Sequence, residues 1–434
     1  MEEKNELDAL REKLLYKQKQ GYDIIDVDER IKLEEYATAY KAYLNAARTE
    51  REAVTEAIAQ AEALGFVPYE RGMVLEPGTK IYKSVRGKAL MLAVMGRETL
   101  DHGANIAAAH VDSPRLDLKP IPLYEKDEIC LLKTHYYGGI KKYQWVALPL
   151  ALHGVVAKKN GELTEICIGE KEDDPVLVIS DLLIHLSGEQ LEKKAAKVIE
   201  GENLDLLIGS IPMQTEDEKV KEKVKANIMN LLSKEYGIEE EDFLSAEIEV
   251  VPAGEAKDYG FDRSMIMGYG HDDRVCAYPS FEAMLVSEDP EITSVCLLVD
   301  KEEIGSVGAS GMQSRFFENT VAEVMAAAGS YSELALRRAL AGSKVLSSDV
   351  SAAFDPNFPS VMTKRNTAYF GKGLVFNKYT GSRGKGGSND ANAEYIGKLR
   401  NIMDTNEVSF QTAELGKVDQ GGGGTIAYIL ANYG

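Results

Sequence analysis

Hydrophobic residues recur at helical spacing over the first part of the chain. Leu7, Leu10 and Leu14 fall on one stripe, and charged residues separate the apolar ones as far as Gly65. Apolar residues three and four positions apart share one face of an α-helix. The spacing therefore predicts helix over residues 5–64, with an amphipathic face that packs against the rest of the protein.

The pattern that follows this helix, and the one that returns near Ser264, are typical of an α/β protein. Short apolar runs predict strands, and the run ITSVCLLV is apolar throughout, as in strands covered on both faces of a sheet. The predicted strands are residues 81–85, 88–95, 104–110, 292–299 and 344–347. Helices are predicted after His271 and over residues 315–328.

Residues 115–249 differ from the sequence on either side, because they lack the Gly-rich turns and clustered acids found later. The elements predicted here are strands at 145–157, 163–168 and 175–179 and a polar helix near 216–236. We predict that this segment is an inserted, largely β domain, and that residues 1–114 and 250–434 form one discontinuous domain. The fold class expected is α/β, with a mixed central sheet flanked by helices.

Composition narrows the possible functions. The chain has 434 residues, enough for two or three domains, and 50 basic against 70 acidic residues give a net charge of −20. This charge repels phosphate backbones and anionic lipid, so we expect neither a nucleic-acid nor a membrane-surface role.

The cysteines and the N-terminus indicate a compartment. Four scattered cysteines form no CxxC pair and no disulfide framework, which favours a reducing environment. The charged start MEEKNELDAL has no signal-peptide core, and the longest apolar run, residues 145–157, is too short to span a bilayer. We therefore predict a cytoplasmic protein.

Acidic residues and one histidine stand where the predicted strands stop. They are His110 after ANIAAA, Asp272 and Asp273 in the run HDD, Glu302 and Glu303 after LLVDK, and Asp349 after KVLSS. Ligands of open α/β sheets bind beyond the carboxyl ends of the strands, so we expect these side chains to converge. One imidazole among several carboxylates suits a divalent metal, mainly zinc, with manganese or cobalt as alternatives.

The spacing of residues within these groups indicates that neighbouring side chains have different roles. If Glu302 and Glu303 extend their strand, their side chains point to opposite sides, so one can bind metal while the other faces a water. His110 and Asp112, two residues apart on an extended chain, share a face, and a carboxylate beside a ligating imidazole fixes its tautomer. Each residue also has an ordinary explanation as a packing, solvated or helix-capping group.

Five segments, in order, resemble a known family. They are HVDSPRLDLKP, GHDDR, DKEEIGSVGA, SSDVSAAFDPNFPS and DQGGGGTIAYILA. Together they resemble the dinuclear zinc aminopeptidases that include aspartyl aminopeptidase and vacuolar aminopeptidase I. The resemblance covers nearly the whole chain from about residue 60 and implies a metal-dependent aminopeptidase that removes the N-terminal residue of a peptide.

The resemblance also implies roles for single residues. His110 and Asp349 correspond to ligands of one zinc, Glu303 to a ligand of the second, and Asp272 to the carboxylate that bridges both. Asp112 corresponds to the carboxylate beside the histidine, and Glu302 to the general base. The peptide bond between Asp272 and Asp273 is often cis in such enzymes.

Assembly is a further implication of the resemblance. The inserted segment 115–249 is similar to the family's dimerisation domain, and family members form dimers that build a tetrahedral dodecamer. Within it, DLLIHL places His185 where the family has a histidine that reaches a neighbouring subunit's active site. We therefore expect a homo-oligomer in which His185 contributes to catalysis.

The chain departs from the family pattern at two points. Lys301 stands where the family has Asn, and no His follows His271, although the family's last zinc ligand is a His beyond TIAYILA. We expect that the segment carrying this His is missing from the chain. As written, the second zinc keeps only Asp272 and Glu303 and should bind weakly.

Alternative functions stay open at this stage. The segment GSRGKGGS at 381–388 nearly matches a phosphate-binding loop, but Gly387 occupies the lysine position. A catalytically impaired assembly or peptide-binding homologue is a second alternative, and a dinuclear hydrolase of another amide a third. For a substrate with an acidic N-terminal residue, the candidate cations are Lys301, Lys364, Arg365 and Lys372.

Overall fold

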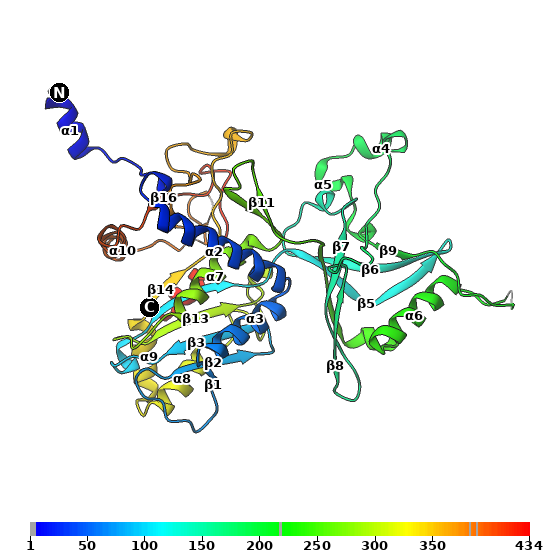
Figure 1. Cartoon of the computed structure of the whole chain (residues 1–434), viewed down its shortest axis with the longest axis horizontal. Coiled ribbons are helices and arrows are strands. Elements are labelled where there is room, and N and C mark those ends of the chain that lie inside the picture. The colour runs from blue at the N-terminus through cyan, green and yellow to red at the C-terminus, as the bar shows by residue number, and fades with distance from the viewer. Residues whose placement is uncertain (1–5, 217–218, 382, 388) are drawn as a thin grey trace. The chain divides into compact units, whose positions relative to one another are not determined.

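The computed structural model describes residues 6–216, 219–381, 383–387 and 389–434. The chain forms two compact units, one of residues 37–349 with 433–434, and one of residues 1–36 with 350–432. Each is described by itself below, and Figure 1 shows the elements of both.

A six-stranded mixed sheet is the centre of the larger unit. Its order is β1 (Val67–Pro68), β2 (Lys80–Val85), β3 (Ala89–Val94), β13 (Ser294–Val299), β4 (Asn105–His110) and β14 (Lys344–Ser347). β13, β4 and β14 run parallel, whereas β3 is antiparallel to β2 and to β13. The predicted mixed central sheet is therefore confirmed, and β14 has the predicted bounds.

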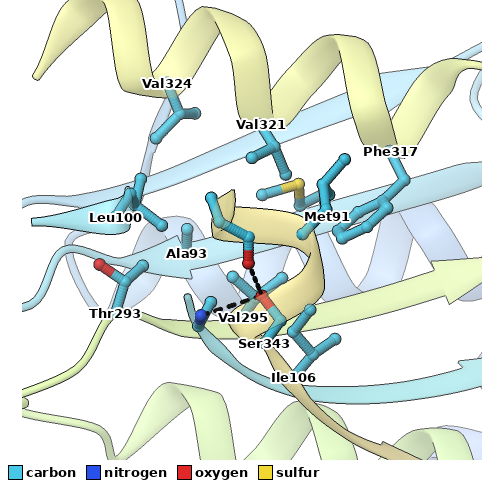
Figure 2. Close-up of a pocket in the computed structure, with 13 residues that line it drawn as sticks. Met91, Ala93, Leu100, Ile106, Thr293, Val295, Phe317, Val321, Val324 and Ser343 are labelled. Atoms are coloured by element: carbon cyan, nitrogen blue, oxygen red, sulfur yellow. Dashed lines mark hydrogen bonds between the residues drawn. The ribbon is translucent and has the colours of Figure 1, made fainter. Parts of the chain in front are cut away.

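Helices cover both faces of this sheet, as alternation along β3 shows. Leu92 packs into a buried cluster with Ala57 of α3 (Glu50–Ala63) and Phe281 of α7 (His271–Leu285). The neighbouring Met91 faces the opposite side, where Phe317 of α8 (Phe316–Ala327) closes an apolar pocket (Figure 2). α9 (Glu333–Gly342) also lines this pocket, which contains none of the predicted site residues.

A second, antiparallel sheet lies in the same unit and has its own core. Its order is β8 (Leu163–Ile168), β7 (Leu150–Ala157), β10 (Ala246–Pro252), β5 (Arg115–Lys126), β6 (Ile129–Tyr137) and β9 (Leu206–Gly209). Val224 of α6 (Lys223–Tyr236) joins its hydrophobic cluster. All six strands fall within residues 115–252, and the domain boundaries inferred from the sequence stay a prediction.

The remaining helices and strands are distributed between the two units. The larger unit also contains α4 (Gly188–Leu191), α5 (Ala195–Val198) and the antiparallel pair β11 (Lys257–Tyr259) and β12 (Met265–Met267). The smaller unit contains α1 (Glu6–Leu14), the parallel pair β15 (Leu374–Asn377) and β16 (Phe410–Ala413), α10 (Ala393–Thr405) and α11 (Ala427–Leu430). α2 (Val27–Ala46) begins in residues 1–36 and ends in the larger unit.

The prediction of one long N-terminal helix over residues 5–64 is wrong in its extent, because the chain forms three helices there. Asp26 and Glu29 satisfy each other's backbone N–H groups at the start of α2. Thr49 and Glu52 form the same reciprocal capping box at the start of α3. Such caps satisfy the free N–H groups of a helix start and so fix where a new helix begins.

Other predicted bounds also change. The strand predicted from residue 145 begins at Leu150, because Pro149 before it has no N–H to donate to a ladder. Residues 175–179 make isolated bridges rather than a strand. Of the segments with predictions, residue 5, residues 217–218 of the polar helix and residues 382 and 388 of the loop-like GSRGKGGS lie outside the described residues. Among the described helices, none is long and apolar enough to cross a bilayer.

Candidate metal centre

Three of the predicted site segments meet because their strands are parallel neighbours. His110 is the last residue of β4, Asp349 follows β14 by two residues, and the turn η7 (Glu302–Ile304) follows β13. Carboxyl ends of parallel strands lie at one edge of a sheet, as the sequence predicts. Asp272 differs, because it enters from the first turn of α7 rather than from the end of a strand in this sheet.

Among the described residues, two groups of potential ligands share His110. One contains His110, Asp272, Asp273 and Asp349, and the other contains His110, Glu302 and Glu303. Within each group the ligand atoms lie within 4.8 Å of one another. All four residues that the sequence assigns to metal therefore converge, together with Asp273 and the predicted base.

His110 is buried and presents one ring nitrogen to the cluster. Its Nδ1 lies 3.0 Å from the backbone O of Asp112 and 3.2 Å from Oδ1 of the same residue, while Nε2 lies 3.2 Å from Oδ1 of Asp272. Burial lowers the pKa of His110, but the carboxylates of Asp112 and Asp272 outweigh it and hold the pKa well above its usual range. With Nδ1 directed at Asp112, Nε2 is the atom placed to bind a cation.

Asp112 is fully buried and binds groups from three segments. Its Oδ1 accepts the backbone N–H of Glu302 at 3.1 Å, and its Oδ2 accepts that of Glu303 at 3.2 Å. Oδ2 also accepts the hydroxyl of Tyr137 at 2.8 Å. Burial raises the pKa of Asp112, but hydrogen bonds from His110 and Tyr137 reverse this, so the net pKa is lowered and the carboxylate stays ionised.

Glu302 and Glu303 do not extend β13, so the predicted alternation across a strand is wrong. They form the 3₁₀ turn η7, preceded by Lys301 in a left-handed conformation (φ 69°). Both are partly buried, and Oε2 of Glu302 lies 4.0 Å from Nε2 of His110. Burial, with added repulsion from nearby carboxylates, raises the pKa of Glu302 to about 7 and that of Glu303 to about 8.

Asp273 is a residue of the cluster to which the sequence assigns no role. It is fully buried, and neither carboxylate oxygen has a hydrogen-bond partner among the described residues. Burial raises its pKa well above the usual range, and Asp349 adds to the effect. The sequence HDD does not indicate which of its three polar residues is buried, because burial depends on how α7 packs. The bond between Asp272 and Asp273 is cis, as the resemblance implies.

The donor set fits a divalent cation. Burial is the main cause of the raised pKa values of Glu302, Glu303 and Asp273, and repulsion among the carboxylates around the one imidazole adds to it. A cation between them would offset this repulsion and satisfy the oxygens of Asp273. Imidazole with carboxylates is a zinc-type ligand set.

Two other residues named from the sequence, His185 and Lys301, have other surroundings. His185 is exposed in the 3₁₀ turn η4 (Ile184–Leu186) and belongs to neither group. Nζ of Lys301 lies 3.5 Å from Oδ2 of the buried Asp300, so its charge already has a partner.

Comparison with known proteins agrees with the resemblance. Residues 43–434 match the family model "Aminopeptidase I zinc metalloprotease (M18)". A probable M18 family aminopeptidase 1 of Clostridium acetobutylicum is 59% identical over 425 residues, which are 97% of this chain and 91% of the relative.

Solved structures share the fold. An M18 aminopeptidase from Thermotoga maritima superposes with a TM-score of 0.92 at 42% identity, over 96% of this chain and 91% of that one. The S. cerevisiae mApe1 dodecamer has a TM-score of 0.71 at 19% identity, over 92% and 88% of the two chains, so it shows likeness of fold alone.

Proposed function

Because the chain belongs to the M18 family of zinc metallo-aminopeptidases, we propose that it releases the N-terminal residue of peptides at the cluster around His110. The observation that carries this assignment is the convergence of one imidazole and five carboxylates at the carboxyl edge of the central sheet. They lie around Nε2 of the buried His110. The other ring nitrogen of His110, Nδ1, is held by Asp112.

Two cations are proposed for this cluster. His110 and Asp349 would hold one, Glu303 the other, and Asp272 would contribute to both, with the buried Asp273 as a further carboxylate of the first group. When bound, such ions polarise a carbonyl and lower the pKa of a coordinated water. The second ion has fewer described donors than the first, so we expect the apoprotein to bind zinc in two steps of unequal affinity.

Glu302 is the proposed general base. Its carboxylate is partly buried beside His110, and its backbone N–H is fixed by Asp112. It would take a proton from the attacking water and deliver it to the leaving amine, so that the peptide bond breaks without releasing a strong base. Asp112 would act indirectly, because it orients His110 and η7 rather than touching the substrate.

The experiment that tests the assignment is Glu302→Gln. The amide keeps the size of the side chain but cannot accept the proton, and general-base catalysis contributes roughly 10²–10⁴-fold, so kcat should fall by about that factor. Zinc affinity of the apoprotein should stay within a few-fold. Glu288→Gln, an exposed change beyond α7, serves as the control. Near-normal kcat in Glu302→Gln would show that another group is the base.

Assembly is proposed as part of the function. Leu182, Leu183, Ile184 and Leu186, the apolar side chains around His185, are each more than half exposed. An apolar segment of this kind is typical of a surface that another subunit covers. With the S. cerevisiae mApe1 dodecamer as a relative in fold, we propose dimers that build a dodecamer, with His185 of the partner subunit stabilising the developing oxyanion.

Substrate preference and location complete the proposal. An acidic N-terminal residue remains the proposed preference. A panel of short peptides differing in the first residue would test it.

The four cysteines are free thiols, which supports a reducing, cytoplasmic location.

A further inference from the structure

The end of strand β6, in the second sheet, reaches the candidate metal centre. Tyr137 is its last residue and is 7% exposed. Its hydroxyl lies 2.8 Å from Oδ2 of Asp112, and because an ionised carboxylate can only accept, Tyr137 is the donor. The same carboxylate faces His110 and accepts the N–H groups of Glu302 and Glu303. One hydroxyl therefore fixes the group that orients both the ligand and the turn.

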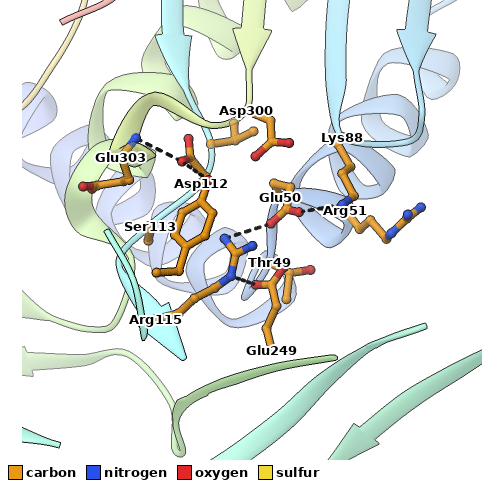
Figure 3. A network of polar contacts seen from close by, with 12 residues as sticks. Thr49, Glu50, Arg51, Lys88, Asp112, Ser113, Arg115, Glu249, Asp300 and Glu303 are labelled. Atoms are coloured by element: carbon orange, nitrogen blue, oxygen red, sulfur yellow. Dashed lines mark hydrogen bonds and ion pairs between the residues drawn. The ribbon is translucent and has the colours of Figure 1, made fainter. Parts of the chain in front are cut away.

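The ring of Tyr137 is itself held in place. The guanidinium of Arg115 lies over it, 3.8 Å from the ring centre. Arg115 in turn pairs with Glu50 of α3 at 3.4 Å and with Glu249 of β10 at 3.1 Å (Figure 3). These pairs join helix α3 to strands β5 and β10 of the second sheet. The place of the Tyr137 ring therefore depends on where that sheet lies relative to α3.

The next residue contacts the cluster directly. Gly138 has φ 71°, and a Cβ added there would lie 3.2 Å from Cβ of Glu303 and 3.3 Å from its Oε2. A side chain at position 138 would therefore press on a proposed ligand. Glycine adopts this left-handed backbone without strain and leaves room for the close approach of Glu303.

We propose that the turn Tyr137–Gly138 is a positioning element of the metal centre. Through this turn the second sheet fixes the orientation of Asp112 and the position of the Glu303 side chain. This inference rests on the proposed metal function of the cluster. Tyr137 acts through Asp112 and does not touch the substrate. Loss of such an outer hydrogen bond typically lowers metal affinity or activity by about 10–100-fold.

The first test compares two tyrosine variants. Tyr137→Phe removes the hydroxyl and keeps the ring under Arg115. Tyr124→Phe is the matched control, because Tyr124 of β5 donates to Oδ2 of Asp205 at 2.7 Å in the same sheet. Zinc affinity of each apoprotein is measured by competition with a chelator, and the ligand-field absorption spectrum is recorded after adding Co²⁺. We expect about 10–100-fold weaker zinc binding and a shifted cobalt spectrum in Tyr137→Phe, and wild-type values in the control.

A second pair keeps the proposal testable if Tyr137→Phe does not fold. Gly138→Ala should weaken zinc binding because its methyl group meets Glu303. Gly237→Ala imposes a similar backbone strain (φ 63°) at the end of α6, where a Cβ meets only Nζ of Lys158 at 3.5 Å. Both alanine variants should lose similar stability, measured by thermal unfolding of the apoproteins, but only Gly138→Ala should lose zinc affinity.

The outcomes separate the two proposals. Wild-type zinc affinity and cobalt spectrum in Tyr137→Phe, or equal zinc affinity in the two glycine variants, would overturn the positioning role. If the wild-type apoprotein binds neither zinc nor cobalt, the metal function itself fails, whatever the variants do.

Discussion

Single buried charges in this protein depend on partners far away in the sequence, and His153 of β7 is an example. Its Nδ1 lies 2.8 Å from Oε1 of Glu52, and its Nε2 lies 3.1 Å from Oε1 of Glu170. Burial lowers the pKa of His153, but these two carboxylates outweigh it and raise the pKa to about 9. The imidazolium therefore links α3 to the second sheet with both ring N–H groups donated.

This link gives the unfolding free energy a pH dependence of known sign. The folded pKa lies above the unfolded value of 6.5, so the contribution is complete below pH 6.5 and is lost as the pH rises through about 9. About 2.5 pKa units correspond to roughly 3 kcal/mol.

Urea unfolding at pH 6 and at pH 10 would measure the prediction. His153→Gln should be destabilised by about that amount more at pH 6 than at pH 10, relative to wild type. His102→Gln, a change on an exposed side chain, serves as the control. A destabilisation of His153→Gln that is the same at both pH values would contradict the proposed charge of His153.

At the scale of elements, the sequence predicts those strands that a local apolar run defines, but not the turns that a distant residue fixes. The apolar run at 344–347 predicts β14, and the run at 163–168 predicts β8, with the observed bounds. The turn at Glu302 is different, because Asp112, 190 residues earlier, accepts its backbone N–H. No local pattern contains that partner, so the sequence predicts the residues of the site but not the turn that presents two of them.

The division of the N-terminal helix was within reach of the sequence. Hydrophobic spacing continues across residues 15–26 and 47–49, but the capping patterns beginning at Asp26 and Thr49 mark new starts. Asp273 lay beyond reach, because its burial follows from how α7 packs against the sheet rather than from its neighbours in the chain.

The cap of α3 supplies a prediction at this scale. The hydroxyl of Thr49 accepts the N–H of Glu52, and the first turn that it fixes carries Glu50 and Glu52, the partners of Arg115 and His153. Thr49→Ala should lower the free energy of unfolding by about 1 kcal/mol, as for other lost caps. Thr49→Ser keeps the hydroxyl and should lose much less. Equal losses in the two variants, measured by urea unfolding, would mean that packing of the methyl group matters rather than the cap.

For the whole molecule, we predict that a single subunit is an incomplete enzyme. The segment around His185 exposes four apolar side chains, and His185 lies in neither ligand group of its own chain. If His185 of the partner subunit serves each site, activity must depend on assembly, because the residue that stabilises the oxyanion arrives only with a neighbour.

Ile184→Asp tests this dependence, since a charge on a covered apolar surface opposes association. Sedimentation should show smaller species than wild type. The kcat per subunit should fall by about 10²–10³-fold, the usual effect of losing one oxyanion donor. Val74→Asp, an exposed apolar residue in the loop before β2, should change neither. A dissociated Ile184→Asp subunit with wild-type kcat would contradict the role of His185, while the metal centre would keep its assignment, because its described ligands all come from one chain.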